Sequence, residues 1–437
     1  MKEKKSQDSI PISKVQRAAK ILGTGAKVGG NYVKYYTKKT FNPSLSKDTL
    51  HENNATDIYE TLSQLKGSAL KVAQMMSMDD QVLPPAYQEK FAMGQYNAPP
   101  LSYPLVVKTF KKYFDKHPDE VFEEFSRDAV NAASMGQVHK AKIDNKSFAV
   151  KIQYPGVANS ISSDLKLVKP LAARLFNMNT ADLNVYLEEV EERLIEETDY
   201  KLELKRANKI AEKCKHIPRL KFPHYYEKLS SVRILTMDWM EGDLLANYYK
   251  TKRSQESRNT VGQTIWDFFL FQLKHLDLVH ADPHPGNFIV NNKEELIVLD
   301  FGCVKEFPKG FTNDYFKLLH PAIFKDDEKR MSIYEEVGFI KPEDSQAERK
   351  KLMQVFDQML LLLAKPFHSN SFDFADDAYF QQIAQMGDQF SKDVELRKMN
   401  NARGSKHSIY LMRTFFGLYN LLHLLKAEVK LNYQLYR

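Results

Sequence analysis

The sequence predicts an α+β fold that is divided into two lobes. In the first half, residues 134–143 and 146–154 contain β-branched or alternating apolar side chains around a polar turn, which is the pattern of a β-hairpin. After residue 260 the apolar residues recur mostly at helical spacing. Strands gathered early in a chain and helices gathered late are typical of α+β proteins.

Length and composition place the chain among ordinary globular proteins. Its 437 residues are enough for two or three compact units, and 43% of them are hydrophobic and 27% charged. Two cysteines, Cys214 and Cys303, exclude a disulfide framework and a four-thiolate zinc site, and they favour a reducing compartment. The basic start lacks the apolar core of a secretory signal, so we expect a cytoplasmic protein. The apolar stretch 415–425 is shorter than the roughly 20 residues of a membrane span and predicts a buried helix.

The first 45 residues are interpreted as a basic helical arm. Residues 1–40 contain ten Lys and Arg against two acidic residues, an excess of eight positive charges in a chain whose net charge is +7. Apolar residues recur at helical spacing between residues 15 and 26. Such a helix can lie on an anionic membrane surface, or it can dock on the folded body. No recognised binding module accompanies the charge, so we do not expect nucleic-acid binding.

A polar, turn-like stretch at residues 41–56 predicts a linker, and a helix is expected to follow it. The apolar stripe of this helix is formed by Ile58, Leu62, Leu65, Ala69, Val72 and Met76. Gly67, Lys71 and Gln74 share a second face, which is small and polar. A further helix is expected at residues 87–98, before a pair of prolines, and a long helical region at residues 160–213.

The stretch His280–Gly302, HADPHPGNFIVNNKEELIVLDFG, contains the clearest chemical pattern. Residues 287–290 and 296–299 are apolar strands joined by a polar turn, so a hairpin brings Asp282, Asn287 and Asp300 together. Two carboxylates and an amide oxygen are the hard ligands that Mg²⁺ prefers when it is shared with substrate phosphates. Each residue alone is typical of a turn or a cap, but their combination at hairpin distance favours phosphate chemistry.

Two further groups of residues are interpreted from this pattern. His280 and His284 are expected to hold the loop through hydrogen bonds, since no third zinc ligand follows at a familiar spacing. Upstream, Lys151 lies on a predicted strand, as does a lysine that pairs the α and β phosphates of a nucleotide. A lysine on a strand is usually just a solvated charge at the edge of a sheet. The presence of the aspartate pair favours the interpretation of Lys151 as a phosphate-binding residue.

Together these motifs resemble the protein-kinase-like superfamily and, within it, the UbiB/ADCK (aarF-domain) atypical kinases, over about residues 15–435. The likeness is carried by LKGSALKVAQMMSMDD, NAASMGQVHKA, EETDYKLE, and HADPHPGN with LDFG. It implies a two-lobed protein-kinase-like fold with a helical N-terminal extension and a mostly helical C-lobe. The implied regions are the arm at 1–45, a helical extension with a lysine–glutamine helix at 46–120, an N-lobe with the nucleotide loop at 121–242 and a C-lobe at 243–437.

The resemblance also implies roles for individual residues. Lys151 becomes the phosphate-pairing lysine, Glu203 its helix partner and Asp282 the catalytic aspartate. Asn287 and Asp300 become ligands of Mg²⁺. The residues expected to bind the nucleotide, ATP, are Ala132, Ala133, Ser134, Gly136, Lys151, Met237 and Met240. The family's own inserts over the active site would contain Lys71, Gln74, Glu197 and Asp199.

Two features depart from ordinary protein kinases, and a third departs from the family itself. The loop at residues 131–136 has one glycine where an ordinary kinase has three, which predicts an altered nucleotide geometry. Lys71 and Gln74 would lie where a protein substrate binds, which argues against phosphorylation of other proteins. Ala73 stands where the family motif has glycine, so close packing through that position is less certain.

The resemblance implies an ATP-binding, Mg²⁺-dependent atypical kinase or ATPase that supports isoprenoid-quinone or membrane-lipid metabolism. Residues 1–40 would then contact an anionic membrane surface or an isoprenoid lipid, as in a peripheral membrane protein, and a homo-oligomer is compatible with the sequence. One alternative is a small-molecule phosphotransferase, because HxDxHPxN loops also resemble those of aminoglycoside and choline kinases. The other is a nucleotide-gated lipid-binding scaffold without catalysis.

Overall fold

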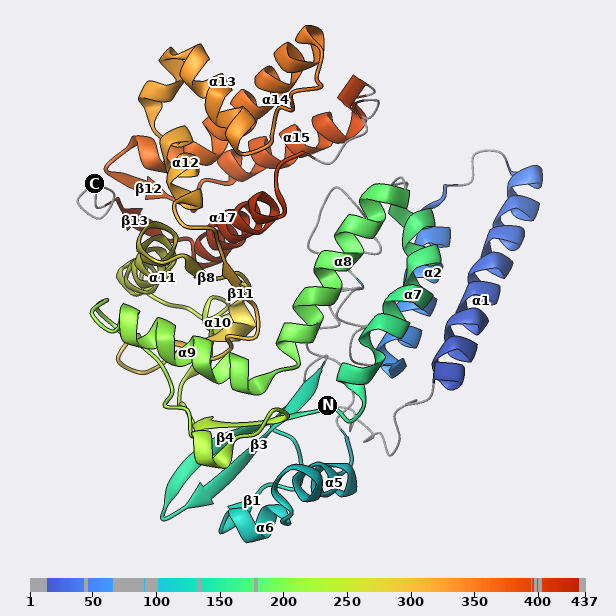
Figure 1. Ribbon diagram of the computed structural model, residues 1–437, viewed down its shortest axis with the longest axis vertical. Helices are drawn as coiled ribbons and strands as arrows, with labels where there is room; N and C mark the ends of the chain where they lie inside the picture. Colours follow the sequence, from blue (N-terminus) through green and yellow to red (C-terminus); the bar gives the residue numbers. More distant parts are fainter. Residues whose placement is uncertain are drawn as a thin grey trace. The chain divides into compact units, whose positions relative to one another are not determined.

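The computed structural model describes residues 14–42, 46–65, 90, 101–132, 135–176, 180–393, 395–396, 399 and 403–431. The predicted site residues Lys71, Gln74, Ala133 and Ser134 lie outside the described residues, as do Ala73 and most of the helix expected at 87–98. The chain divides into two compact units, Met1–Leu204 with Tyr225–Trp239, and Lys205–His224 with Met240–Arg437. Figure 1 follows the elements of both units along the sequence.

The first unit contains an antiparallel sheet and a set of helices. The strands are β1 (Glu124–Phe125), β2 (Asn131–Ala132), β3 (Gly136–Ile143), β4 (Lys146–Gln153) and β6 (Ile234–Asp238). They follow the order β1-β3-β4-β6, and β2 pairs with β3. The helices are α1 (Lys14–Phe41), α2 (Asp48–Leu65), α5 (Tyr103–Phe114), α6 (Pro118–Val121), α7 (Val157–Phe176), α8 (Thr180–Glu197) and the start of α9 (Tyr200–Cys214), with the short 3₁₀ helix η2 (Glu227–Leu229).

The predicted hairpin of the first unit is confirmed. β3 and β4 pair along their whole length and are joined by the two-residue turn Asp144-Asn145, in which both residues have positive φ, 49° and 63°. Asp and Asn tolerate this left-handed conformation, and two such residues give a turn whose twist matches the strands. The turn fixes the register in which Lys151 lies opposite Val138 on β3 and Leu235 on β6.

The sheet has an aromatic core on one side. Phe110 of α5 lies against Phe122, and Phe122 lies against Phe148 of β4. All three rings are at most 4% exposed and belong to one buried cluster with Val150 and Ile152. Burial of apolar rings of this size is the main source of stability for such a layer.

The predicted linker at residues 41–56 is wrong over most of its length. α1 extends to Phe41 and α2 already begins at Asp48. Asn54 of the predicted linker and the following Asp57 instead form hydrogen bonds between the two helices: Asn31 Nδ2 donates to Asn54 Oδ1 and to Asp57 Oδ2, at 2.9 Å each. Asn54 is fully buried. Buried polar groups need hydrogen-bond partners, and Asn31 of α1 supplies one. The polar residues of this segment therefore belong to a polar interface between α1 and α2.

One face of the basic arm docks on the folded body. Arg17 of α1 donates to both carboxylate oxygens of Asp164 on α7, at 2.6 Å each, and to the carbonyl oxygen of Leu65 on α2 at 2.8 Å. The side chains of Arg17 and Asp164 are 4% and 0% exposed. The docked position is therefore held by a buried two-pronged ion pair.

The second unit is mostly helical. Its helices are α10 (Leu245–Tyr248), α11 (Gln255–His275), α12 (Phe311–Leu318), α13 (Asp327–Glu336), α14 (Gln346–Ala364), α15 (Asp377–Lys392) and α17 (Lys406–Leu425), with the 3₁₀ helices η3 (Pro285–Asn287), η4 (Pro321–Lys325) and η5 (Lys365–His368). Its small sheets are β5 (Leu220–Lys221) with β10 (Leu296–Val298), β9 (Phe288–Val290) and β7 (Asp243–Leu244); β11 (Val304–Glu306) with β8 (Leu278–His280); and β12 (Ser371–Asp373) with β13 (Glu428–Lys430).

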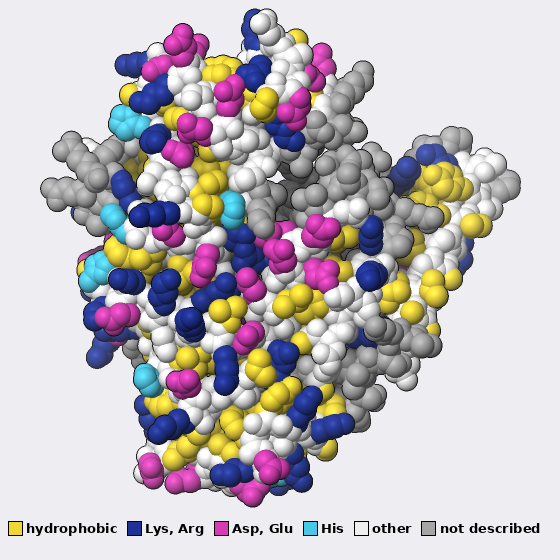
Figure 2. Space-filling model, in the orientation of Figure 1, with side chains coloured by type: hydrophobic (Ala, Val, Ile, Leu, Met, Phe, Trp, Pro, Cys, Tyr) yellow, Lys and Arg dark blue, Asp and Glu magenta, His cyan; other side chains and the backbone are white. Residues whose placement is uncertain are grey.

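The apolar stretch at residues 415–425 is a buried helical segment, as predicted. It forms the second half of α17, where Leu418, Leu422 and Leu425 are fully buried. Over the part of the chain that the structure describes, no helix is both long enough and apolar enough to cross a membrane. Charged side chains of both signs are interspersed on the visible face (Figure 2).

Candidate functional site

The candidate site of the first unit is an ion pair that the resemblance predicts. Lys151 lies in the middle of β4, and its Nζ is 3.0 and 3.1 Å from the two carboxylate oxygens of Glu203 on α9. The Glu203 side chain is 1% exposed and that of Lys151 is 16% exposed. A carboxylate this deeply buried is stable only when it is paired. The structure therefore holds the ammonium group of Lys151 in one place.

Asp199 fixes the start of the helix that carries Glu203. Its Oδ1 accepts the backbone N–H groups of Lys201 and Leu202, at 3.0 and 3.2 Å. These bonds satisfy N–H groups that have no partner within the helix, which is the usual role of a capping aspartate. Glu197 lies at the C-terminal end of α8, two residues earlier. The structure thus places Asp199 as a helix cap, and the insert role expected from the resemblance remains a proposal.

Tyr200 is a site residue that the sequence analysis missed. Its ring is 2% exposed and lies 5.1 Å below the Nζ atom of Lys151, within the range of a cation–π interaction. Its hydroxyl oxygen lies 2.8 Å from the position that a Cβ atom at Gly136 would take, and the carbonyl oxygen of Ile152 lies at 2.6 Å. Only glycine fits at residue 136. The sequence feature that could have indicated this residue is its position directly after Asp199, within the motif EETDYKLE.

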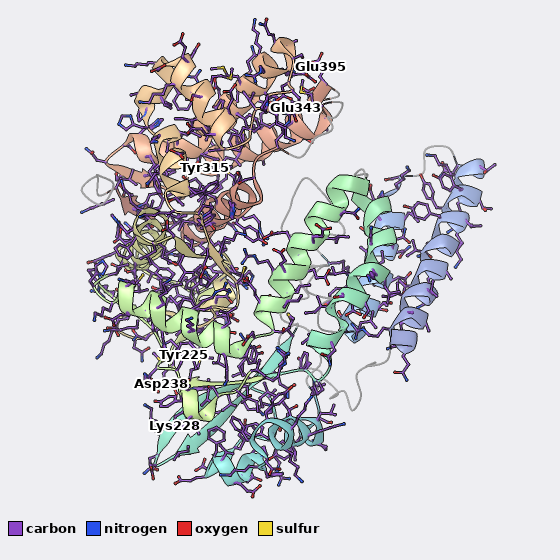
Figure 3. The ribbon with its side chains drawn as sticks, in the orientation of Figure 1. Tyr225, Lys228, Asp238, Tyr315, Glu343 and Glu395 are labelled. Atoms are coloured by element: carbon purple, nitrogen blue, oxygen red, sulfur yellow. The ribbon has the colours of Figure 1, made fainter. Side chains whose placement is uncertain are left out.

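The other predicted nucleotide contacts of the first unit lie on the same sheet. Ala132 is in β2, next to the start of β3. Met237 is in β6, opposite Ala149 of β4, and is 6% exposed. Tyr225 forms a β-bridge with Met237, and Asp238 accepts a hydrogen bond from Tyr226. Tyr225 and Asp238 are labelled in Figure 3. The second unit is built from two segments of the chain, and Met240 is the first residue of the later segment.

The hairpin predicted around residues 287–299 is confirmed in the second unit. β9 and β10 are antiparallel, with Ile289 opposite Ile297. Beyond the paired strands, the backbone N–H of Leu299 donates to the carbonyl oxygen of Asn287 at 2.9 Å. The residue after Leu299 is Asp300, so the hairpin brings Asp300 next to Asn287, as the pattern predicts.

Asn287 and Asp282 are in direct contact. The Asn287 Nδ2 atom donates to Asp282 Oδ2 and to the Asp282 carbonyl oxygen, at 3.0 Å each. Asp300 accepts the backbone N–H of Gly302 on its Oδ1 at 2.8 Å. With its nitrogen engaged by Asp282, Asn287 has its amide oxygen as the remaining atom for binding a cation.

His280 is the common neighbour of the two aspartates. Its Nε2 lies 2.8 Å from the carbonyl oxygen of Asp300, and its ring is 1% exposed. Burial lowers the pKa of His280, while the charges of Asp282 and Asp300 act in the opposite direction. His284 accepts the backbone N–H of Gly286 on Nδ1. Both histidines therefore hold the loop through hydrogen bonds, as expected from the sequence.

The donor set of the loop fits Mg²⁺. Within the described residues no group of three or more His, Cys, Asp or Glu side chains is arranged to hold a metal. Mg²⁺ does not need such a group, because it binds one or two carboxylates and takes water and phosphate oxygens for its other positions. Asp300 and the amide oxygen of Asn287 supply hard oxygen ligands of this kind, and a metal that prefers sulfur or imidazole would find neither in this set.

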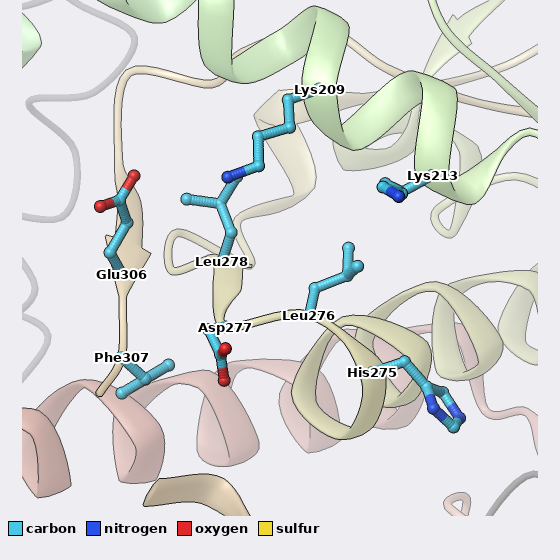
Figure 4. A pocket seen from close by; sticks show the side chains of 8 residues that line it. All are labelled: Lys209, Lys213, His275, Leu276, Asp277, Leu278, Glu306 and Phe307. Atoms are coloured by element: carbon cyan, nitrogen blue, oxygen red, sulfur yellow. The ribbon is translucent and has the colours of Figure 1, made fainter. Parts of the chain in front are cut away.

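A separate cavity of the second unit contains none of the predicted site residues. Its volume is about 290 Å³, and it is lined by Lys209, Lys213, His275, Leu276, Asp277, Leu278, Glu306 and Phe307 (Figure 4). The cavity lies at the first residue of β8, whereas Asp282 lies two residues beyond the last residue of this strand. Since charged side chains of both signs surround it, we interpret it as a solvated depression of the surface.

Comparisons with known proteins agree on one family. The ABC1 atypical kinase-like domain matches residues 93–334, more than half of the chain. The probable serine/threonine-protein kinase abkA of Dictyostelium discoideum is 28% identical over 381 residues, which cover 82% of this chain and 66% of that protein. The mitochondrial atypical kinase COQ8 of Saccharomyces cerevisiae is 28% identical over 392 residues, covering 87% of this chain and 77% of its own length.

A solved structure also shares the fold. The complex of Rv3197 with erythromycin from Mycobacterium tuberculosis has 27% sequence identity and a TM-score of 0.59, over 88% of this chain and 96% of that chain. This match confirms the kinase-like α+β fold with its helical N-terminal region. The chain spans slightly less than two thirds of abkA, so the activity of the whole relative does not transfer with the match. From the motifs, the fold and these matches together, the chain belongs to the ABC1 atypical kinase-like family, the UbiB/ADCK group of atypical kinases.

Proposed function

We propose that this protein binds ATP with Mg²⁺ and acts as an atypical kinase or ATPase. The observation that carries the proposal is the Lys151–Glu203 ion pair. In protein kinases the corresponding lysine binds the α and β phosphates only while a helical glutamate holds it in place. Gly136 and Tyr200 support the same interpretation, because a Cβ position at Gly136 lies 2.8 Å from the Tyr200 hydroxyl and the Tyr200 ring lies 5.1 Å from Lys151 Nζ.

Residues of the second unit would carry out the chemistry. Asp282 would orient the attacking hydroxyl or water, as the catalytic aspartate of a kinase does. Its carboxylate is held in position for this role by the hydrogen bond from Asn287. Asn287 and Asp300 would hold Mg²⁺, which when bound neutralises charge on the phosphates. In the first unit, Lys151 would hold the nucleotide phosphates, and Glu203 holds Lys151. His280 stays neutral and fixes the backbone of Asp300.

The test is Mg²⁺-dependent turnover of ATP by the full chain. We expect wild type to release phosphate, and Asp282→Asn and Asp300→Asn to lose about 100-fold or more in kcat, as for removal of one key electrostatic group. Circular dichroism checks that both variants fold. ATP binding without turnover in wild type would contradict the proposal and support the scaffold, whereas transfer to an added alcohol or amine would support the small-molecule phosphotransferase.

We further propose that the protein works at a membrane surface and supports isoprenoid-quinone or related lipid metabolism, as the family resemblance implies. While one face of α1 is docked, the other exposes Leu22, Val33 and Tyr36, at 72%, 68% and 54%. From Lys14 to Phe41 the helix contains seven Lys and Arg and no acidic residue. Exposed apolar side chains among cations fit an anionic interface, where each adds to binding.

Vesicle flotation tests this second proposal. Wild type is expected to float with vesicles of phosphatidylcholine and phosphatidylglycerol and not with phosphatidylcholine alone. The triple variant Leu22→Ser, Val33→Ser, Tyr36→Ser is expected to remain unbound at the bottom of the gradient with both kinds of vesicle. Equal flotation of wild type and variant would remove α1 from the proposal. Two relatives are named mitochondrial, so cell fractionation is needed to decide between that compartment and the cytoplasm.

A further inference from the structure

Helix α17 contacts the loop that carries Asp282, here called the catalytic loop (residues 281–287), at one position where no side chain fits. A Cβ atom at Gly417 would lie 2.2 Å from Cγ, 3.2 Å from Cβ and 3.3 Å from Cδ of Pro283. Ordinary contact between such atoms begins at about 3.4 Å, so a methyl group at residue 417 would displace the proline ring by about 1.2 Å. Pro283 is buried, which leaves the ring little room to move away.

The glycine is not explained by the helix itself. Gly417 lies within the 20-residue helix α17, whose neighbouring positions carry large side chains such as Phe415 and Leu418. Glycine is one of the least favourable residues in a helix interior, because it gains no side-chain packing and loses the most backbone freedom. A residue that disfavours its own helix is expected to serve a contact, and the contact here is Pro283.

Pro283 follows Asp282 directly, and the backbone of Asp282 is held from the other side. The carbonyl oxygen of Asp282 accepts hydrogen bonds from the backbone N–H of His284 at 2.7 Å and from Asn287 Nδ2 at 3.0 Å. The N–H of Ala281 donates to the carbonyl oxygen of Cys303 at 2.9 Å. These bonds fix the loop from the side of the hairpin, and the Pro283–Gly417 contact fixes it from the side of α17.

We propose that Gly417 is a positioning residue for Asp282. Its missing side chain lets α17 support Pro283, and this support sets where the carboxylate of Asp282 lies. The inference rests on the proposed function, in which Asp282 orients the attacking group. Gly417 touches neither nucleotide nor acceptor in this proposal, so it acts only through Pro283.

The test is a double-mutant cycle on the full chain, read out by ATP turnover. Gly417→Ala is expected to lower kcat by about 100-fold with little change in KM for ATP, because a misplacement of about 1 Å in a catalytic group has this effect. Pro283→Ala removes the ring that the new methyl group meets. The double variant Gly417→Ala, Pro283→Ala is therefore expected to recover at least tenfold in kcat over Gly417→Ala alone.

Gly262 of α11 offers a matched control. A Cβ atom there would lie 2.4 Å from the Cβ of Ala427, which is outside the catalytic loop. Gly262→Ala is therefore expected to lower the unfolding temperature and to leave kcat of the folded protein within twofold of wild type. If Gly262→Ala lowers kcat as Gly417→Ala does, the effect belongs to packing in general and the proposal is wrong.

The remaining outcomes are decisive as well. Wild-type kcat in Gly417→Ala, or effects of the Gly417 and Pro283 substitutions that simply multiply in the double variant, would overturn the inference. If Gly417→Ala does not fold, the double variant carries the test: folding with restored turnover supports the inference, and folding without turnover contradicts it. Absence of turnover in wild type would instead contradict the proposed function.

Discussion

Replacement of Glu203 by glutamine tests the nucleotide site in the first unit. At the observed separation of 3.0 Å, two unit charges attract each other by about 5.5 kcal/mol at an effective dielectric constant near 20. Much of this is offset by the loss of hydration, so the net effect on stability is smaller. Glutamine keeps the shape and one hydrogen-bond acceptor but removes the charge that holds Lys151 in place.

We expect Glu203→Gln to lower kcat/KM for ATP by about 100-fold, which corresponds to about 2.7 kcal/mol of lost transition-state stabilisation. The assay is initial-rate phosphate release as a function of ATP concentration at fixed Mg²⁺. Lys146→Gln on the same strand is the control, because the Lys146–Asp238 pair is also a close ion pair, at 2.9 Å, but the Lys146 side chain is 53% exposed. Unchanged kcat/KM in Glu203→Gln, or an equal loss in Lys146→Gln, would refute the assignment.

Three other predictions concern stability. Arg17→Met should destabilise the first unit by about 3–5 kcal/mol, because it leaves Asp164 buried without its cation. The double variant Arg17→Met, Asp164→Leu should recover most of this lost stability. Urea unfolding of both variants measures the two effects. Burial raises the pKa of Asp267 to about 6, so the folded state keeps a proton that the unfolded state releases, and stability should fall between about pH 4 and 6 and stay level above. Asp267→Asn should remove this fall and unfold at higher temperature than wild type at pH 7 in calorimetry, and a lower temperature would contradict it. Gly29→Ala should stabilise α1 by about 1 kcal/mol, since nothing lies within 4 Å of the added methyl group, and unchanged or lower protection of α1 in hydrogen exchange would argue against it.

Local patterns of the sequence were sufficient to predict both hairpins and the contact between Asp282 and Asn287. The two strands around residues 288–298 are short, apolar and separated by a polar turn, so their pairing depends on neighbouring residues alone. The same holds for the Asp144-Asn145 turn, whose residue types specify the conformation. Asp282 and Asn287 are five residues apart, and their contact follows directly from the loop.

Contacts between distant segments could not be predicted in this way. Asn54 lies in a stretch whose composition suggests a turn, and only the presence of Asn31 on a neighbouring helix makes it an interface residue. The contact of Gly417 with Pro283 depends on the path of α17, which periodicity does not encode. Lys71 and Gln74 lie outside the described residues, so their expected place over the active site stays a prediction.

The ion pair between Arg17 and Asp164 limits how the chain can be shortened. The two residues are 147 positions apart, so a chain begun after residue 17 would contain α7 with a buried carboxylate and no cation to neutralise it. Loss of membrane binding in such a shortened chain would then report misfolding of the first unit as well as loss of the arm. Expression of this domain for crystallisation or lipid assays should therefore start upstream of Arg17, with surface substitutions in place of truncation.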